Sequence, residues 1–500
     1  MLTLLPSTFH NFKMIRNYEK EISKLSINIF DRAAYTTKRI RLLRKTRYLI
    51  FFVWPVVELL RKIGVMVIYV LLITLIIEFM IAYISSRHII VSPTCIISGV
   101  FIIATIDLIR NIEYWEVELG WGTYIVIAGG IACFLLASLT AKYIYQAFKP
   151  YKSTINSSSI QLIRMRRWKV YISTLFCGVI FLLLFKYIRN FSGSGNIASI
   201  ISSYRIASLK GEIQFPTVIN LLNKVLVASG YIWIYILINN YLILKKIDLF
   251  LAINIILVLM SYFITGARGK MIYLILSAIP IFFFLWCSKN GEIRKLRFKY
   301  LVRIIIVLLI IAFVFRATAN IMGRTITLDL MQHLSVNLSA PILNIDTFIK
   351  KKWVKPTIWG YNTFGYFIST LGRNFGISKW VYIIDLPFQV RNGHALGNVY
   401  TTFYSYYYDF HYIGVYVLSA IMGFISQISF ETCRVSCFKI KKIKLSVILY
   451  SNIFITLAFS FFSNKFYETF VTFSFIQMMI IWSLLIWGIE KVNIKLKWTK

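Results

Sequence analysis

Acidic residues are scarce in this chain: 19 Asp and Glu stand against 56 Lys and Arg among 500 residues, a formal net charge of +37. Charged residues of both signs make up only 15%, whereas a soluble domain carries about a quarter. Hydrophobic residues make up 58%. These values exclude a soluble globular protein, so most of the chain must face lipid or other helices.

Motifs that bind nucleotides or metals are also missing. The sequence has no Gly-Lys-Ser/Thr phosphate loop, no His-Glu-x-x-His and no dense carboxylate cluster, so we expect no metal and no other cofactor. Its six cysteines fall in apolar runs or a basic loop, which argues against a disulfide framework. Lys and Arg flank the apolar runs, where they face anionic membrane lipids, so we expect no nucleic acid.

Eleven segments are apolar enough to cross a bilayer, which takes about 20 helical residues. They are 64–84, 89–109, 122–145, 170–187, 218–239, 247–265, 271–287, 301–315, 412–430, 446–462 and 470–489. The run 48–60, which contains Pro55 and Glu58, is either a short twelfth span or an interfacial segment. The predicted fold is an all-α polytopic membrane bundle of about 11–12 spans.

Basic connections orient this bundle. The tail 491–500 is basic and is assigned to the cytoplasm. Alternation then places the Lys- and Arg-rich segments 149–169, 245–246, 289–300 and 431–445 inside, and 111–121, 189–217, 266–270 and 316–411 outside. The predicted location is the bacterial inner membrane, with many passes and a cytoplasmic C-terminus.

The chain divides into five parts on this interpretation. Residues 1–63 form a basic extension, which is either one extra span or an artefact of the start site, with Met66 as the alternative start. Residues 64–316 hold the first eight spans, 317–411 a long external loop that is partly helical, 412–490 the last three spans, and 491–500 the tail. No internal repeat is visible, which argues against an inverted-repeat transporter.

Positive charge on the outer side runs against the positive-inside bias and asks for a functional explanation. An Arg fork matches the oxygens of a diphosphate, so a diphosphate-linked lipid is the ligand we expect. Any one of these side chains could instead be an ordinary solvated cation. The candidate diphosphate-binding residues are Arg205, Arg268, Lys270, Arg324, Arg373 and Arg391.

Three residues are candidates for proton transfer. An imidazole can exchange a proton near neutral pH, so His394 could take the proton of an attacking sugar hydroxyl, although a surface histidine is the alternative. Asp409 and Asp329 are the carboxylates that could replace it. The tyrosines between 400 and 408 form either an aromatic belt or a sugar platform.

Three places resemble the Wzy-type O-antigen and capsule polysaccharide polymerases. The first is Ser92-Pro93 opening a span, and the second is the Thr-Gly-Ala-Arg-Gly turn at 265–269. The third is Gly-Asn-Val-Tyr-Thr at 397–401, followed by Asp409 and Gly414. His411 stands where this family often has a small residue, and residues 1–63 have no counterpart.

The resemblance implies a GT-C-like bundle and a metal-independent glycosyltransferase. It would transfer a growing glycan from undecaprenyl diphosphate onto a new lipid-linked repeat unit at the periplasmic face, in O-antigen or capsule biosynthesis. The implied partners are this lipid-linked oligosaccharide, membrane lipids, a chain-length regulator and a flippase. A flippase for lipid-linked oligosaccharides and an O-antigen ligase are the alternative functions.

Overall fold

The computed structural model describes residues 64–149, 160–163, 165–193, 195–210, 212–291, 293, 329–381, 386–438 and 443–491. Within these ranges the chain is a bundle of α-helices with one hairpin of two antiparallel strands. The prediction of an all-α polytopic bundle is confirmed. Residues 1–63, the predicted span 301–315 and nearly all of the predicted tail lie outside the described residues.

Eight of the described helices are long and apolar enough to cross a membrane. They are Gly64–Ser85, α3 (Pro93–Arg110), α5 (Trp121–Phe148), α6 (Arg167–Ser192), α8 (Thr217–Leu244), α10 (Arg268–Leu276) continued by α11 (Ala278–Asn290), α16 (Thr402–Ser436) and α19 (Phe473–Lys491). Each covers a predicted span. The chain is therefore a multi-pass membrane protein.

Two predicted spans form helices shorter than a full crossing. They are α9 (Leu249–Ile264) and α17 (Leu445–Ala458). The Asp248 side chain caps the start of α9 by accepting the backbone N–H of Phe250 at 3.1 Å, and the turn at Gly266, with φ of 70°, follows its end. Local capping and turn residues thus set the length of α9.

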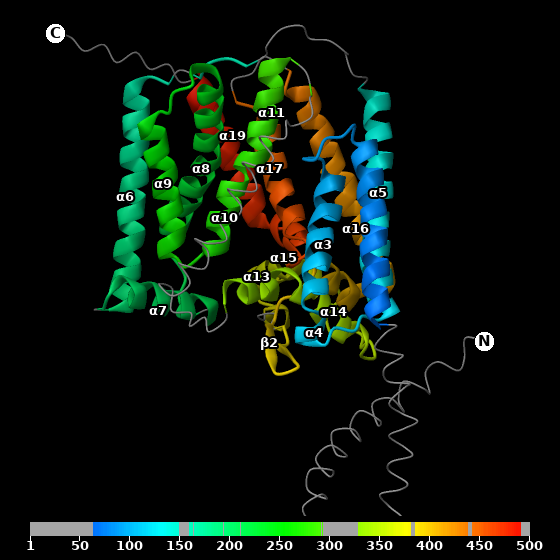
Figure 1. The fold of residues 1–500 in the computed structure, drawn as a ribbon. Helices are drawn as coiled ribbons and strands as arrows, with labels where there is room; N and C mark the ends of the chain where they lie inside the picture. The colour runs from blue at the N-terminus through cyan, green and yellow to red at the C-terminus, as the bar shows by residue number, and fades with distance from the viewer. Residues whose placement is uncertain are drawn as a thin grey trace, which may run out of the picture. The chain divides into compact units, whose positions relative to one another are not determined.

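Short elements gather at one end of the bundle, the lower end in Figure 1. They are α4 (Ile112–Trp115), α7 (Ile197–Lys210), α13 (Leu330–Leu338), α14 (Ala340–Ile349), α15 (Tyr361–Asn374), the 3-10 helix η1 (Ser378–Trp380), β1 (Gln389–Arg391) and β2 (His394–Gly397). We call α13, α14, α15, η1, β1 and β2 the lobe, and this end of the bundle the lobe end. Helices α13, α14 and α15 lie within residues 317–411, the segment predicted to form a long external loop.

Buried carboxylates attach the lobe to the membrane helices. Asp346 of α14 is buried and accepts the Gly120 backbone N–H at 2.8 Å and the Thr123 hydroxyl at 2.7 Å, both at the start of α5. Asp107 of α3 accepts the hydroxyl of Ser335 in α13 at 3.1 Å. Because buried acceptors are costly to leave without donors, these bonds fix where α13 and α14 sit.

Helices α5 and α16 pack closely along much of their length. Small residues permit the approach: a Cβ at Gly129 of α5 would lie 2.8 Å from the Tyr416 ring of α16. Helix α16 begins at Thr402, ten residues before the predicted span. Its first two turns are rich in tyrosine and mostly buried, so their composition did not distinguish them from an aromatic loop.

Candidate anion-binding site

Two of the predicted arginines meet at the turn between α9 and α10. Gly266 has φ of 70°, and a Cβ there would lie 3.0 Å from the Cβ and Cδ atoms of Arg205. The stem of Arg205, from α7, therefore packs directly on this turn, and Arg268 begins α10 two residues further on. Arg268 is only 6% exposed. A glycine is required here both by the backbone angle and by the arginine stem.

Two lysines from other helices lie near Lys270, which follows this turn in α10. Lys270 of α10 is close enough to Lys224 of α8 and to Lys465 for their positive charges to repel one another. Lys224 donates to the Gln477 side chain at 2.6 Å. We call Arg205, Lys224, Arg268, Lys270 and Lys465 the cationic cluster.

Lys465 lies in the short helix α18 (Lys465–Phe470) and forms an ion pair with Glu468 at 2.6 Å. Burial opposes the charge on Lys465, but the Glu468 carboxylate and the Tyr273 hydroxyl outweigh it and raise the pKa of this lysine above its ordinary value. Lys465 therefore stays protonated at neutral pH and contributes to the positive charge of the cluster. Such an arrangement favours an anionic ligand.

The start of α10 adds to this preference. The first backbone N–H groups of a helix have no acceptor within the helix, and the helix dipole is positive at that end. Arg268 stands at the first position of α10, and Ala267 before it makes no side-chain capping bond. Helix dipole and side chains thus favour negative charge at the same place.

Sequence reasoning missed Lys224 and Lys465. Lys224 lies within the predicted span 218–239, near its N-terminal end, where a lysine is not unusual. Lys465 follows the predicted span 446–462, and alternation of the spans assigns its connection to the same side as the turn 266–270. The available signal was thus the expected side of this short connection, which carries Lys465.

Two other predicted residues, His394 and Arg391, lie on the β1–β2 hairpin. The His394 ring stacks on Tyr114 of α4 with 3.9 Å between ring centroids. Arg391 donates to the backbone carbonyl of Glu116 at 2.7 Å, and Asn392 donates to that of Tyr114 at 3.2 Å. These contacts hold the hairpin against the α3–α5 connection. His394 remains a candidate base, in a position partly covered by Tyr114.

Asp409 is fully buried in α16 and binds the start of α15. Its carboxylate accepts the backbone N–H of Thr363 at 2.7 Å and that of Asn362 at 3.2 Å. Both groups belong to the first turn of α15, which otherwise leaves its N–H groups without acceptors. These are the contacts of a helix cap, so Asp409 positions α15.

The remaining candidates do not join the cationic cluster in the described contacts. Arg373 lies exposed at the end of α15, where its Nε donates to the Ser369 carbonyl at 3.4 Å. Arg324 lies outside the described residues. The cluster therefore retains Arg205, Arg268 and Lys270 of the predicted set and gains two lysines.

Helix α16 has a break that the sequence did not reveal. His411 has φ of 59° and ψ of −152°, angles that interrupt the helix. The Tyr408 carbonyl, three residues before the break, accepts the indole N–H of Trp353 at 3.0 Å. The His411 ring packs against Trp353, Tyr407 and Tyr412, with the Tyr407 hydroxyl 3.1 Å from its Nε2. The aromatic segment 403–412 therefore packs mostly in the core or around the break at His411.

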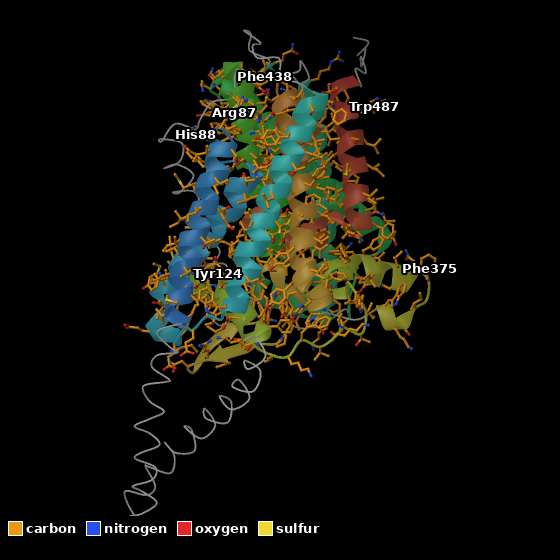
Figure 2. All side chains as sticks on the ribbon, turned by 90° about the vertical axis from the view of Figure 1, so that its right-hand side faces the viewer. Arg87, His88, Tyr124, Phe375, Phe438 and Trp487 are labelled. Atoms are coloured by element: carbon orange, nitrogen blue, oxygen red, sulfur yellow. The ribbon has the colours of Figure 1, made fainter. Side chains whose placement is uncertain are left out.

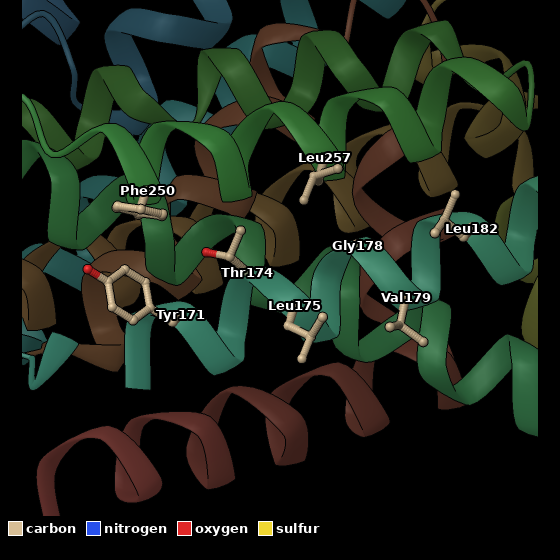
Figure 3. A pocket seen from close by; sticks show the side chains of 8 residues that line it. All are labelled: Tyr171, Thr174, Leu175, Gly178, Val179, Leu182, Phe250 and Leu257. Atoms are coloured by element: carbon tan, nitrogen blue, oxygen red, sulfur yellow. The ribbon is translucent and has the colours of Figure 1, made fainter. Parts of the chain in front are cut away.

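A groove between α6 and α9 differs from the cationic cluster in chemistry (Figure 3). It is lined mainly by aliphatic and aromatic side chains, among them Leu175, Val179, Phe250 and Leu257. Its polar lining groups are the hydroxyls of Tyr171 and Thr174. Such a surface suits acyl chains of the surrounding bilayer and offers no charge for catalysis.

Comparisons with family models, with curated proteins and with solved structures find no match for this chain. The resemblance to the polysaccharide polymerases therefore stays a prediction from a few short motifs. The function must be argued from the residues themselves.

Proposed function

We propose that this protein is a polysaccharide polymerase of the outer face of the bacterial inner membrane. It would transfer glycan from undecaprenyl diphosphate onto the free sugar end of a new lipid-linked repeat unit. The observation that carries the proposal is the cationic cluster. It brings basic side chains from α7, α8, α10 and α18 together near the turn between α9 and α10. A lipid diphosphate is an anion that reaches such a place along the membrane.

The chemistry that these cations would perform is neutralisation of the leaving group. Transfer of the glycan breaks the bond between its anomeric carbon and the diphosphate oxygen, and negative charge grows on that oxygen. Guanidinium groups held before the reaction starts stabilise this charge without reorganising. Arg268 is the best placed for this role because it is buried at the start of α10.

The acceptor hydroxyl must lose its proton as the new bond forms. His394 is the candidate base for this step, since the contacts of Asp409 are those of a helix cap. The lobe would hold the acceptor sugar. Confinement of both lipid-borne substrates in one membrane lowers the entropic cost of bringing them end to end.

Deletion of the gene tests the class of function. A polymerase deletion should leave single repeat units on the lipid A core, a ligase deletion bare core, and a flippase deletion precursor trapped in the cytoplasm. Gel analysis of the glycan distinguishes these outcomes. Bare core or trapped precursor would overturn the proposal and favour the ligase or the flippase.

Variants of the cationic cluster test the site. Arg268→Ala should shorten the glycan ladder and lower the rate by about a hundredfold, the scale for removing one group that stabilises transition-state charge. Arg268→Lys should recover only part, because an ammonium cannot form the bidentate contact. Lys352→Gln is the matched control, because Lys352 is an exposed cation between α14 and α15. Full ladders from both Arg268 variants would remove the site.

A further inference from the structure

Helix α15 has one face buried and one face exposed. Tyr361, Thr363, Gly365 and Gly372 are buried on the inner face. Tyr366 is 62% exposed, and Phe375, directly after the helix, is 72% exposed. Both aromatic side chains are therefore available to contact a surface outside the protein.

The position of this face indicates what covers it. Figure 2 shows Phe375 projecting sideways beyond the membrane helices, level with the end of the bundle. Helix α15 is joined to the start of α19 by the stacked rings of Phe367 and Phe473, whose centroids lie 5.3 Å apart. The exposed apolar surface of α19 includes Ile476, Ile480 and Leu484. The exposed surface of α15 therefore adjoins a helix that faces lipid.

Charge on the same segment fits a lipid headgroup layer. Arg373 at the end of α15 and Lys379 in η1 are both exposed, and they flank Phe375. Basic side chains beside aromatic rings are typical of helices that lie in the membrane interface. Anionic phospholipids present the complementary charge within reach of these cations.

We infer that α15 and η1 bind the surface of the bilayer that surrounds α19. Phe375 enters the boundary between headgroups and acyl chains, while Arg373 and Lys379 contact the phosphates of anionic phospholipids. Arg373, a predicted ligand of the substrate diphosphate, is thereby reassigned to bulk lipid. This inference concerns the bilayer alone and holds whether or not the protein is a polymerase.

Docking of α15 also fixes one wall of the cationic cluster. The Tyr366 side chain lies within electrostatic reach of Lys465 and Glu468, and α15 packs against α18. Asp409 holds the opposite end of α15 through its first turn. A helix held by α16 at its start and by lipid at its end keeps a defined place beside the cations.

Spin-label accessibility tests the inference on the full chain in lipid nanodiscs. We would introduce Phe375→Cys in a Cys133→Ser background, because Cys133 is the partly exposed one of the native cysteines and the other five are buried. A nitroxide at 375 should be several-fold more accessible to oxygen, relative to a water-soluble nickel chelate, than one at Val390→Cys. Val390 is the matched control because it is apolar, 62% exposed and on the hairpin.

Two results would overturn the inference. Equal accessibility to the nickel chelate at 375 and 390 would put α15 in water. Low accessibility of the 375 label to both reagents would mean that a protein partner covers this face. Either outcome is independent of glycan synthesis, so it can be told apart from failure of the polymerase proposal.

Lipid charge provides the second arm of the test. Replacing phosphatidylglycerol by phosphatidylcholine in the nanodiscs should weaken docking by about fivefold for each basic residue involved. In the double variant Arg373→Gln, Lys379→Gln, the accessibility of the label at 375 should no longer differ between the two lipids. A label at 375 that still becomes more accessible to the nickel chelate in phosphatidylcholine would refute the assignment of these two cations.

Discussion

The backbone angles at the His411 kink predict that glycine at this position is more stable than alanine, the reverse of the usual order within a helix. The φ of 59° and ψ of −152° at His411 fall in a region that glycine adopts freely and that side chains with a Cβ rarely occupy. We therefore expect His411→Gly to be more stable than His411→Ala. Both variants lose the contacts of the imidazole with Trp353, Tyr407 and Tyr412, so the comparison isolates the backbone.

The magnitude follows from two opposing contributions. Relief of the strained backbone is worth about 1–3 kcal/mol, and the greater freedom of glycine in the unfolded chain costs about 0.5–1 kcal/mol. The glycine variant should thus exceed the alanine variant by about 1–2 kcal/mol. In an ordinary helix interior the order is reversed, with glycine about 1 kcal/mol less stable than alanine.

Thermal and denaturant unfolding of the purified full chain in one detergent measures this difference. Ala420→Gly, at a partly exposed helical position of the same α16, is the control and should lose about 1 kcal/mol. If alanine at 411 proved as stable as glycine, the kink would carry no strain and the argument would fail.

Two further perturbations follow from the same contacts. Gly414→Ala would place a Cβ 2.6 Å from the Tyr406 carbonyl oxygen, and it should destabilise the chain by about 1–3 kcal/mol in the same unfolding assay. Lys444, before α17, is buried, which lowers its pKa to about 8. Because the unfolded chain holds this proton up to a pH near 10.5, stability should rise between about pH 8 and 10.5 by roughly 1 kcal/mol per unit, and Lys444→Met should remove that rise.

Hydrophobic length predicted the membrane helices well because it is a local property of the sequence. The run 64–84 became Gly64–Ser85, and 170–187 became the centre of α6. The start of α16 was missed by ten residues, since Tyr406 and Asp409 look polar in sequence but are buried in the fold. Burial by a distant segment such as α15 is a tertiary property, and no local window contains it.

Only part of the candidate site could be predicted from the sequence, because its residues come from distant parts of the chain. Arg205 and Arg268 were chosen from their expected side of the membrane, and they do meet at the Gly266 turn. Lys465 arrives there from nearly 200 residues further along the chain, which no spacing rule could join to α10. Asp409 was chosen as a reactive carboxylate, but helix capping requires the same chemistry of an acceptor.

The scarcity of acidic residues acquires a structural meaning at the lobe end. Asp346 accepts donors from the start of α5, Asp107 accepts a hydroxyl from α13, and Asp409 accepts the first turn of α15. Each of these carboxylates accepts hydrogen bonds that connect a lobe helix to a membrane helix. In the cationic cluster, by contrast, the Glu468 carboxylate pairs with Lys465. Introducing an acidic residue into the cationic cluster should therefore weaken anion binding more than it destabilises the fold, because the carboxylates that attach the lobe to the bundle lie elsewhere.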